Sequence, residues 1–318
     1  MSANLQNPAF TDEAKAREAL EAVRWPNGPI CPHCGNVDQD KLAKAAGKAV
    51  RPGLWYCAAC NDQFTVTVGT VMERSHVPLT KWWLAMHLLG SSKKGVSAHQ
   101  IHRQLGITYK TAWFMCHRIR EAMRVGNLEP MGGAGKIVEA DETYFGNVPE
   151  SKRPTKTTSG RPFTKRGKTG PSGKRAVVSL VERGGTVRSF HPATADGESV
   201  AAIVRENIHR ETRLHTDESR LYSKVGAEFA AHETVNHSKK EYARGDVTTN
   251  TVETYFSVFK RGMRGVYQHC DEKHLHRYLA EFDFRFNNRT ALGVTDSERV
   301  AKIAKGIEGK RLTYRLPH

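Results

Sequence analysis

The stretch IVEADETYFG, residues 137–146, alternates apolar and polar side chains enough to predict a β-strand. In such a strand Asp141 shares one face with Glu139 and Thr143. Glu142 follows directly, so strand parity alone favours Asp141 over Glu142 as the acid that faces a site. The stretch therefore predicts a strand that carries a carboxylate near its centre.

The segments after this strand predict a mixed α/β sheet with flanking helices. Residues 175–192 contain two β-prone runs around Gly-Gly, the pattern of a hairpin. Residues 198–208 have the pattern of a helix, and residues 213–222 predict a strand that ends at Asp217. A further helix begins near Asn250. This order of strand, hairpin, helix, strand and helix favours one mixed sheet.

The composition indicates a soluble protein with a polyanionic partner. The 318-residue chain contains 49 Lys and Arg against 33 Asp and Glu, a formal net charge of +16 and a pI near 9.7. This excess favours nucleic acid as the partner but leaves the chemistry open, since ribosomal proteins, repressors and nucleases share it. No apolar run approaches the roughly 18 residues that a membrane span needs, and the polar N-terminus lacks a secretory signal. We therefore expect a cytoplasmic protein with reduced cysteines.

Four of the six cysteines form two CxxC pairs separated by 22 residues. Each pair places two thiolates on one tight turn, and two such turns provide the tetrahedral set of four sulfurs that zinc prefers. The stretches GLWYC and QFTVTVGTVM predict short strands of a zinc ribbon. A redox pair or a disulfide could explain one CxxC, whereas two favour zinc, in a structural role because no coordination position stays open. The predicted ligands are Cys31, Cys34, Cys57 and Cys60.

Residues 79–90 have the apolar stripe of a helix, and residues 97–124 predict two further helices. Ser97 is the expected N-cap of the first of these two, Gly106 ends it, and Thr108 caps the second. Two short helices around a glycine-containing turn resemble a helix-turn-helix, so DNA contact is favoured over a three-helix bundle with a merely solvated basic face. The basic residues of the second helix are Lys110, His117, Arg118 and Arg120.

Glycine and charge patterns divide the chain. Residues 126–136 are glycine-rich without periodicity and predict a linker. A basic insertion at 151–175 holds nine Lys and Arg, including Lys165 and Arg166, and no acid, so a mobile loop ordered only by a polyanion is expected. The predicted divisions are an N-terminal helix with zinc ribbon (1–75), a helical DNA-binding segment (76–128), an α/β domain with this insertion (129–300) and a basic C-terminal tail (301–318).

Three acids on separate predicted elements could serve phosphoryl transfer. This chemistry uses two divalent cations about 4 Å apart, and such hard cations take oxygen ligands. Asp141 on the first strand, Asp217 at the end of a later strand and Glu253 on the helix near Asn250 could supply them. Each has an ordinary explanation when taken singly, since Asp217 suits a turn or helix N-cap and Glu253 suits a solvated helix surface. Together they predict a site for divalent metal.

The chain resembles the DDE-type insertion-sequence transposases, specifically the group with an N-terminal zinc ribbon. The resemblance spans about residues 20–290 and is carried by CPHC…CAAC, VEADETYFG, LHTDES, NTVETYFSVFKRGMRGVYQH and KHLHRYLAEFDFRFNNR. It implies an RNase H-like fold for the α/β domain, which is then the catalytic domain. It also implies dependence on Mg²⁺ or Mn²⁺, action on the terminal inverted repeats of a mobile element, and a dimer or larger assembly on paired DNA ends.

The family's signature of Asp, Asp, Asn or Glu, and Lys carries over to this sequence. It corresponds to Asp141, Asp217, either Asn250 or Glu253, and Lys260. Asn250 offers a neutral amide oxygen and suits a helix N-cap. Glu253 offers a full charge and lies at the familiar 35-residue gap from Asp217. We favour Glu253 as the third metal ligand.

Lys260 lies seven residues beyond Glu253, so the two side chains share one helix face, roughly 10 Å apart along the axis. A cation in that position can hold a phosphate beside the metals without repelling the acid. Arg261 and Arg264 follow it and are expected to continue the contact with the DNA backbone.

The resemblance implies a DNA transposase. Its ribbon and helical segment would recognise the element ends, and its catalytic domain would hydrolyse a phosphodiester and join the 3′-OH to double-stranded target DNA. One alternative is a metal-dependent nuclease that cuts DNA without strand transfer. Another is a zinc-ribbon DNA-binding regulator, or an inactive descendant that binds without cutting. The presence of all three acids favours the transposase.

Overall fold

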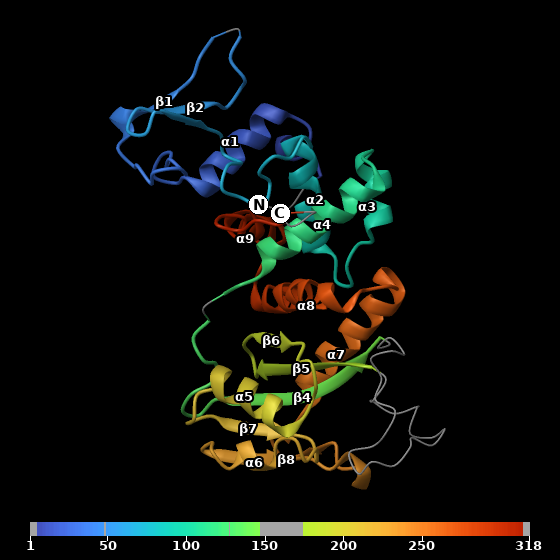
Figure 1. The fold of residues 1–318 in the computed structure, drawn as a ribbon. Helices are drawn as coiled ribbons and strands as arrows, with labels where there is room; N and C mark the ends of the chain where they lie inside the picture. The colour runs from blue at the N-terminus through green and yellow to red at the C-terminus, as the bar shows by residue number, and fades with distance from the viewer. Residues whose placement is uncertain (1–4, 48, 127, 147–173, 314–318) are drawn as a thin grey trace. The chain divides into compact units, whose positions relative to one another are not determined.

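In the computed structural model, the described residues are 5–47, 49–126, 128–146 and 174–313. They form two compact units (Figure 1). Unit 1 consists of Met1–Val125 and Asn288–His318, and unit 2 consists of Gly126–Asn287. Unit 1 is therefore built from two separate stretches of the chain.

A small antiparallel sheet follows helix α1 (Glu13–Arg24) in unit 1. Its strands, in spatial order, are β1 (Leu42–Lys44), β2 (Trp55–Cys57) and β3 (Asp62–Phe64). The prediction of a strand through residues 63–72 is wrong beyond Phe64, because the chain turns there. Gly69 has a φ of 73°, and the hydroxyl of Thr70 donates to the carbonyl of Thr67 at 2.7 Å.

Four helices complete the main packing of unit 1. They are α2 (Leu79–Ser91), α3 (Ala98–Leu105), α4 (Tyr109–Met123) and α9 (Asp296–Lys305). The last of them packs against α1, α2 and α4, with Ile303 fully buried. The predicted boundary at residue 300 differs from this arrangement, because α9 spans that boundary and belongs to unit 1.

The predicted basic tail is also packed over its described part. Ile307 is fully buried, and the amide of Val71 donates to its carbonyl at 3.1 Å. Glu308 accepts a hydrogen bond from the guanidinium of Arg24 at 3.2 Å. Residues 306–308 therefore contribute to unit 1, and the tail prediction is wrong for this stretch.

Unit 2 contains a mixed five-stranded sheet, which confirms the predicted α/β fold class. Its strands are β4 (Ile137–Phe145), β5 (Arg175–Glu182), β6 (Val187–Phe190), β7 (Arg213–Thr216) and β8 (Ala231–Thr234). The spatial order is β6-β5-β4-β7-β8, with β7 and β8 running parallel to β4 and the first three strands antiparallel. The predicted hairpin is β5–β6, and the edge strand β8 was not predicted.

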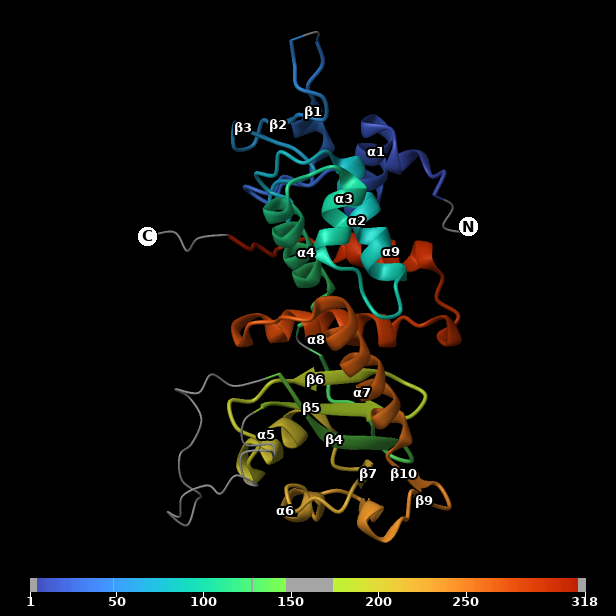
Figure 2. The same ribbon diagram turned by 90° about the vertical axis from the view of Figure 1, so that its right-hand side faces the viewer.

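Helices cover both faces of this sheet, because its central strands are apolar on both sides. Helix α5 (Gly197–Asn207) packs its buried valines against Val138, Val178 and Leu180. On the opposite face, α7 (Asn250–Gly262) runs across β4 and β5 (Figure 2), and Phe256 and Phe259 join Val177 and Val181 in the core. Helix α8 (Glu272–Asn287) packs beside β6 in the same core.

Shorter elements connect these parts. They are α6 (Ser223–Gly226), β9 (Ala243–Arg244), β10 (Val247–Thr248), a π-helical turn at Met263–Tyr267, and 3₁₀ turns at Pro8–Phe10, Gln39–Lys41, His237–Lys239 and Thr290–Leu292. Strands β9 and β10 form a two-stranded hairpin that leads directly into α7. Within the described ranges, every helix is too short or too polar to traverse a bilayer.

Candidate active site and zinc centre

The register of the sheet brings Asp141 and Asp217 together. Strands β4 and β7 are parallel, with Ile137 opposite Arg213 and Glu139 opposite His215. Two further residues along both strands lead to Asp141 and to Asp217, which lies one residue past the end of β7. Oxygen atoms of these two acids and of Glu142 all lie within 4.8 Å of one another.

Glu142 joins this cluster although strand parity assigns it to the other face of β4. The strand β7 pairs with β4 only as far as Glu139, so that side of β4 is open beside Asp141 and Glu142. Asp217 leaves the sheet at this opening and meets side chains from both faces. The sequence places Glu142 beside Asp141, but the end of β7, which creates the opening, is a feature of the fold.

The three carboxylates repel one another in a partly buried site. Burial, followed by the charges of Asp217 and Glu142, raises the pKa of Asp141 to about 8. Burial also raises the pKa values of Glu142 and Asp217. Lys260 lies near enough for the charge of Asp141 to raise its pKa, although burial has the larger effect and lowers it. A site with this surplus of negative charge is suited to a cation.

Glu253 lies outside this close cluster but near it. Its side chain is 44% exposed, and its Oε1 accepts a hydrogen bond from the Thr249 hydroxyl at 2.9 Å. The same oxygen lies 3.2 Å from Nε2 of His237. Its charge still raises the pKa of Asp141, and the charge of His237 lowers the pKa of Asp217. His237 therefore interacts with both acids, a role that no sequence pattern suggested.

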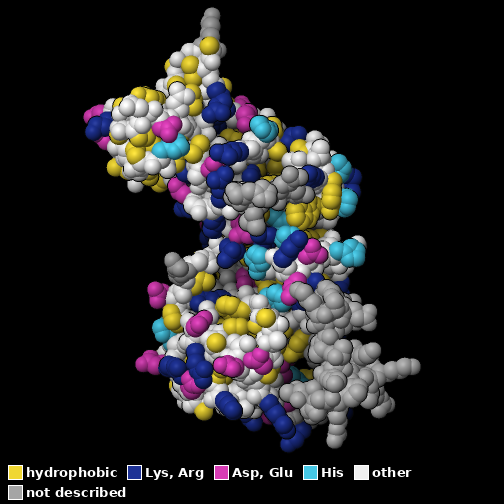
Figure 3. Space-filling model, viewed as in Figure 1, with side chains coloured by type: hydrophobic (Ala, Val, Ile, Leu, Met, Phe, Trp, Pro, Cys, Tyr) yellow, Lys and Arg dark blue, Asp and Glu magenta, His cyan; other side chains and the backbone are white. Residues whose placement is uncertain are grey.

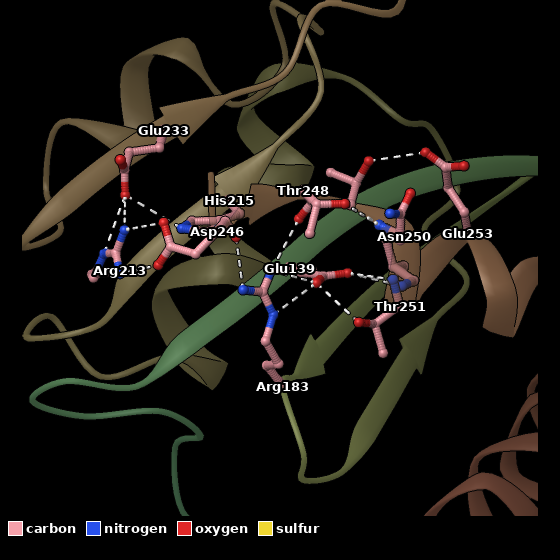
Figure 4. A network of polar contacts seen from close by, with 12 residues as sticks. Glu139, Arg183, Arg213, His215, Glu233, Asp246, Thr248, Asn250, Thr251 and Glu253 are labelled. Carbon is pink, nitrogen blue, oxygen red and sulfur yellow. Dashed lines mark hydrogen bonds and ion pairs between the residues drawn. The ribbon is translucent and has the colours of Figure 1, made fainter. Parts of the chain in front are cut away.

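Asn250 begins α7 but is not its N-cap. The cap position is Thr249, and the amide of Asn250 donates to the Thr248 hydroxyl at 3.0 Å. The exposed side chain of Asn250 and that of Glu253 both belong to the first turn of the helix (Figure 4). The expectation that Asn250 caps this helix is wrong, because the helix begins one residue earlier, with Thr249 at the cap position.

A buried acid on β4 holds the start of α7 in place. Glu139 is fully buried, and its Oε2 accepts hydrogen bonds from the amides of Thr251 and Val252 at 2.8 and 3.1 Å. Its Oε1 accepts from the Thr251 hydroxyl at 3.0 Å and pairs with the guanidinium of Arg183 at 2.8 Å (Figure 4). A carboxylate at a helix N-terminus satisfies free amides and complements the helix dipole. Glu139 thus fixes α7 to the strand that carries Asp141.

The basic residues after Glu253 lie on the later turns of α7 and just beyond it. Lys260 is half-buried, whereas Arg261 and Arg264 are exposed. Arg261 donates to the carbonyl of Ser257 at 3.1 Å, and the positive charge of Arg264 lowers the pKa of Lys260. The predicted DNA contacts Lys165 and Arg166, with most of the basic insertion, lie outside the described residues.

The four predicted zinc ligands converge in unit 1. Their sulfurs all lie within 4.8 Å of one another, with 3.7 Å between Cys31 and Cys60 and 3.7 Å between Cys34 and Cys57. A tetrahedral zinc with bonds of about 2.3 Å places its sulfurs about 3.8 Å apart, so the set fits this ion. Each CxxC is closed by a left-handed residue, Gly35 with φ of 73° and Asn61 with φ of 58°.

The helical segment has the predicted caps but a different basic face. The side chains of Ser97 and Thr108 accept hydrogen bonds from helix amides, and Gly106 is left-handed. His117 and Arg120, two of the four basic residues of the second predicted helix, are buried, because α4 packs against α2, α3 and α9.

Of the two predicted DNA contacts on α4, one is exposed and one is engaged within unit 1. Lys110 is exposed in the first turn of the helix. The half-buried guanidinium of Arg118 donates to the carbonyls of Glu73 and Leu312 at 3.3 and 3.4 Å and lies over the ring of Phe114.

Comparison with known proteins matches both units to one family. Residues 132–287 match the model of the ISXO2-like transposase domain, and residues 11–63 match the model of the transposase zinc-ribbon domain. The chain is 28% identical over 288 residues to a Halobacterium salinarum protein named "Uncharacterized protein in transposable element ISH50". That similarity covers 87% of this chain and 91% of the relative.

Among solved structures, the chain is similar to one in a cryo-EM structure of the simian T-cell lymphotropic virus intasome in complex with the PP2A regulatory subunit B56 gamma. The identity is 13%, the coverage is 57% of this chain and 63% of that chain, and the TM-score of 0.28 supports no conclusion. The two domain matches together cover more than half of the chain and fall on the cysteine cluster and the sheet with Asp141 and Asp217. The chain therefore belongs to the DDE-type insertion-sequence transposases that carry an N-terminal zinc ribbon.

Proposed function

We propose that the protein is a DNA transposase that binds the terminal inverted repeats of its element, cleaves a phosphodiester bond there and transfers the 3′-OH to target DNA. The observation that carries the proposal is the convergence of Asp141 and Asp217 at the open edge of β4, with Lys260 near Asp141. Membership of the transposase family supports the same reaction.

Asp141, Asp217 and Glu253 would hold Mg²⁺ or Mn²⁺, because their oxygen donors suit hard cations. When bound, such ions activate an attacking water or 3′-OH and stabilise the leaving oxygen. Lys260 would hold the scissile phosphate, because it is half-buried and near enough to Asp141 for the two charges to interact. Arg261 and Arg264 continue the contact with the phosphate backbone.

Unit 1 would recognise the element ends through the zinc ribbon and the α3–α4 pair. Lys110 in the first turn of α4 is exposed toward a partner, whereas Arg118 would stabilise the helix from within. On the face of the molecule in Figure 3, acidic side chains lie among the basic ones, so the positive charge is not spread evenly over this surface. Specific contact by one unit, rather than the net charge, then positions the DNA, and two chains would hold two ends together.

The test is an end-cleavage assay with Mg²⁺ or Mn²⁺ on DNA that carries the inverted repeats flanking the coding region. We expect Glu253→Gln to abolish strand cleavage while end binding stays within a few-fold of wild type. The matched control is Glu206→Gln, an exposed acid on α5 at the opposite face of the sheet, which should cleave normally. Full cleavage by Glu253→Gln would remove this residue from the site.

The same assay separates the other functions that fit this family of folds. A cut donor end that becomes covalently joined to a target plasmid supports the transposase. Cleavage without joined product would instead indicate a nuclease. End binding without cleavage under Mn²⁺ would indicate a DNA-binding regulator descended from a transposase.

A further inference from the structure

Glu142 has one carboxylate oxygen engaged and one without a hydrogen bond of good geometry. Its Oε1 accepts a hydrogen bond from the Ser219 hydroxyl at 3.1 Å. Its Oε2 is buried and makes no hydrogen bond of good geometry among the described residues. An unpaired buried oxygen of an acid is costly, and native structures rarely keep one without a ligand, a proton or a water to satisfy it.

Tyr222 is a second buried polar group at this place and lies beside the carboxylate of Glu142. Its side chain is completely buried in the core beneath α5, and its hydroxyl makes no hydrogen bond of good geometry within the described chain. The hydroxyl faces the acids, since after burial the charges of Glu142 and Asp141 have the largest effects on its pKa. Its close approach to Glu142 raises its pKa further and lowers the pKa of that acid. A buried polar group is therefore directed into the carboxylate cluster.

The positions of these groups follow from the end of β7. Asp217 and Ser219 lie on the loop that leaves the strand, and the amide of Ser219 donates to Asp217 Oδ1 at 2.9 Å. The hydroxyl of the same serine reaches Glu142. One loop thus orients two of the three clustered acids, and a cation between them would complete the coordination that the unpaired Oε2 lacks.

We propose that Glu142 is a further ligand of the divalent cation at Asp141 and Asp217, with Ser219 and Tyr222 as positioning residues for its carboxylate. The inference rests on the proposed function in one respect, the binding of a cation by Asp141 and Asp217. Side chains from both faces of β4 then approach the ion from two directions. Positioning groups of this kind commonly change metal affinity 10- to 100-fold.

This arrangement separates the roles of the two glutamates. Glu142 belongs to the cluster whose oxygens lie within 4.8 Å of one another, whereas Glu253 pairs with His237 on α7. The cation held by β4 and the loop after β7 therefore binds without α7, and Glu253 would add its charge when DNA and a second ion are present. Cation binding in the absence of DNA depends on Glu142 more than on Glu253.

The experiment is a calorimetric titration of the full-length protein with Mn²⁺ alone, without DNA. We expect Glu142→Gln to weaken Mn²⁺ binding at least 10-fold, Tyr222→Phe to weaken it several-fold, and Glu253→Gln to weaken it less than Glu142→Gln does. The control Glu206→Gln should change it less than about three-fold. Wild-type affinity in Glu142→Gln with lost binding in Asp141→Asn would overturn the inference and leave the proposed function intact. Wild-type affinity in Asp141→Asn as well would overturn both.

Thermal unfolding separates a ligand from a structural acid. Without metal, Glu142→Gln should unfold at the same or a higher temperature than wild type, because it removes repulsion from Asp141 and Asp217. It should also lose most of the stabilisation that Mn²⁺ gives to wild type. A lower unfolding temperature without metal together with full stabilisation by Mn²⁺ would mean that Glu142 serves the fold only. If Glu142→Gln does not fold, Ser219→Ala is the variant that tests the inference. We expect it to bind Mn²⁺ several-fold more weakly than wild type, and unchanged binding would contradict the inference.

Discussion

Asp283 on α8 is a partly buried acid that is held by hydroxyl groups and an amide. Its Oδ1 accepts hydrogen bonds from the hydroxyls of Tyr255 and Ser189 at 2.6 and 2.7 Å, and its Oδ2 accepts from the amide of Ser189 at 2.9 Å. Burial raises its pKa to about 6, although these hydrogen bonds act in the opposite direction. The acid connects α8 to α7 and to β6, and its contribution to the free energy of unfolding depends on pH.

We therefore predict that the difference in the free energy of unfolding between wild type and Asp283→Asn depends on pH. The ordinary pKa of this group is 3.8, so between about pH 4 and pH 6 the folded protein holds a proton that the unfolded chain has released. The contribution of Asp283 to the free energy of unfolding is therefore full below this window and falls as the pH rises through it. Denaturant unfolding followed by far-UV circular dichroism at pH 5 and pH 7 measures this.

We expect the free energy of unfolding of wild type, minus that of Asp283→Asn, to be larger at pH 5 than at pH 7. Titration of other groups affects both proteins alike and cancels in this difference. A difference that grows with pH would mean that a cation stabilises the ionised carboxylate.

Among the elements, α7 shows how one buried contact sets a helix against a strand. The helix has no side-chain N-cap hydrogen bond of its own, and Glu139 from β4 supplies the missing acceptors. Glu139 and Asp141 point from the same face of the same strand, so the contact that anchors the helix lies two residues from the candidate site. The position of Glu253 relative to Asp141 depends on this contact.

Glu139→Gln should loosen the start of α7. The amide of glutamine presents donors where two helix amides and Arg183 require acceptors, and breaking a buried ion pair of this kind costs about 3 kcal/mol. Hydrogen exchange followed by mass spectrometry should show faster exchange in the first turns of α7, with that of α5 little changed. Glu253→Gln, on the same helix but half exposed, is the control and should exchange as wild type.

Unchanged protection of α7 in Glu139→Gln would show that packing of Phe256 and Phe259 alone holds the helix. In that case the contact of Glu139 with α7 would have no influence on the candidate site, and Glu139→Gln should leave cation binding unchanged as well.

The elements also show which features local sequence can predict. The caps Ser97, Gly106 and Thr108 were predicted because capping depends on side chains within a few residues. The edge strand β8 and helix α9 were missed, because short segments acquire their structure from the neighbours on which they pack. Parity selected Asp141, which lies in the acid cluster, but excluded Glu142, which lies there too, since parity cannot tell where a neighbouring strand ends.

At the scale of the whole molecule, the chain leaves unit 1 after Val125, builds unit 2 and returns at Asn288. The returning helix α9 places Ile303 in the core of unit 1, and Arg299 beside it donates to the carbonyl of Asn288 at 2.7 Å. The sequence predicted one continuous domain from 129 to 300, because a pattern of residues does not reveal which distant segment a helix packs against.

Ile303→Ala should destabilise unit 1 by about 2–4 kcal/mol, because it leaves a cavity in a well-packed core. All five tryptophans of the chain precede residue 126 in the sequence, so tryptophan fluorescence reports on unit 1. Thermal unfolding followed in this way should occur at a lower temperature in Ile303→Ala. The control is Lys305→Ala, an exposed change on the same helix. Equal unfolding temperatures for the two variants would show that α9 does not stabilise unit 1.

Because unit 2 separates the two stretches of unit 1 in the sequence, the order of synthesis has a consequence for folding. Domains usually fold in the order in which they leave the ribosome. Here residues 126–287 emerge completely before α9 does, so unit 2 can fold while unit 1 still lacks one of its helices. A ribosome that stops between the two would release a chain with the acid cluster assembled and unit 1 unfinished. Completion of translation itself would then act as a safeguard, because the unit proposed to select element ends matures last.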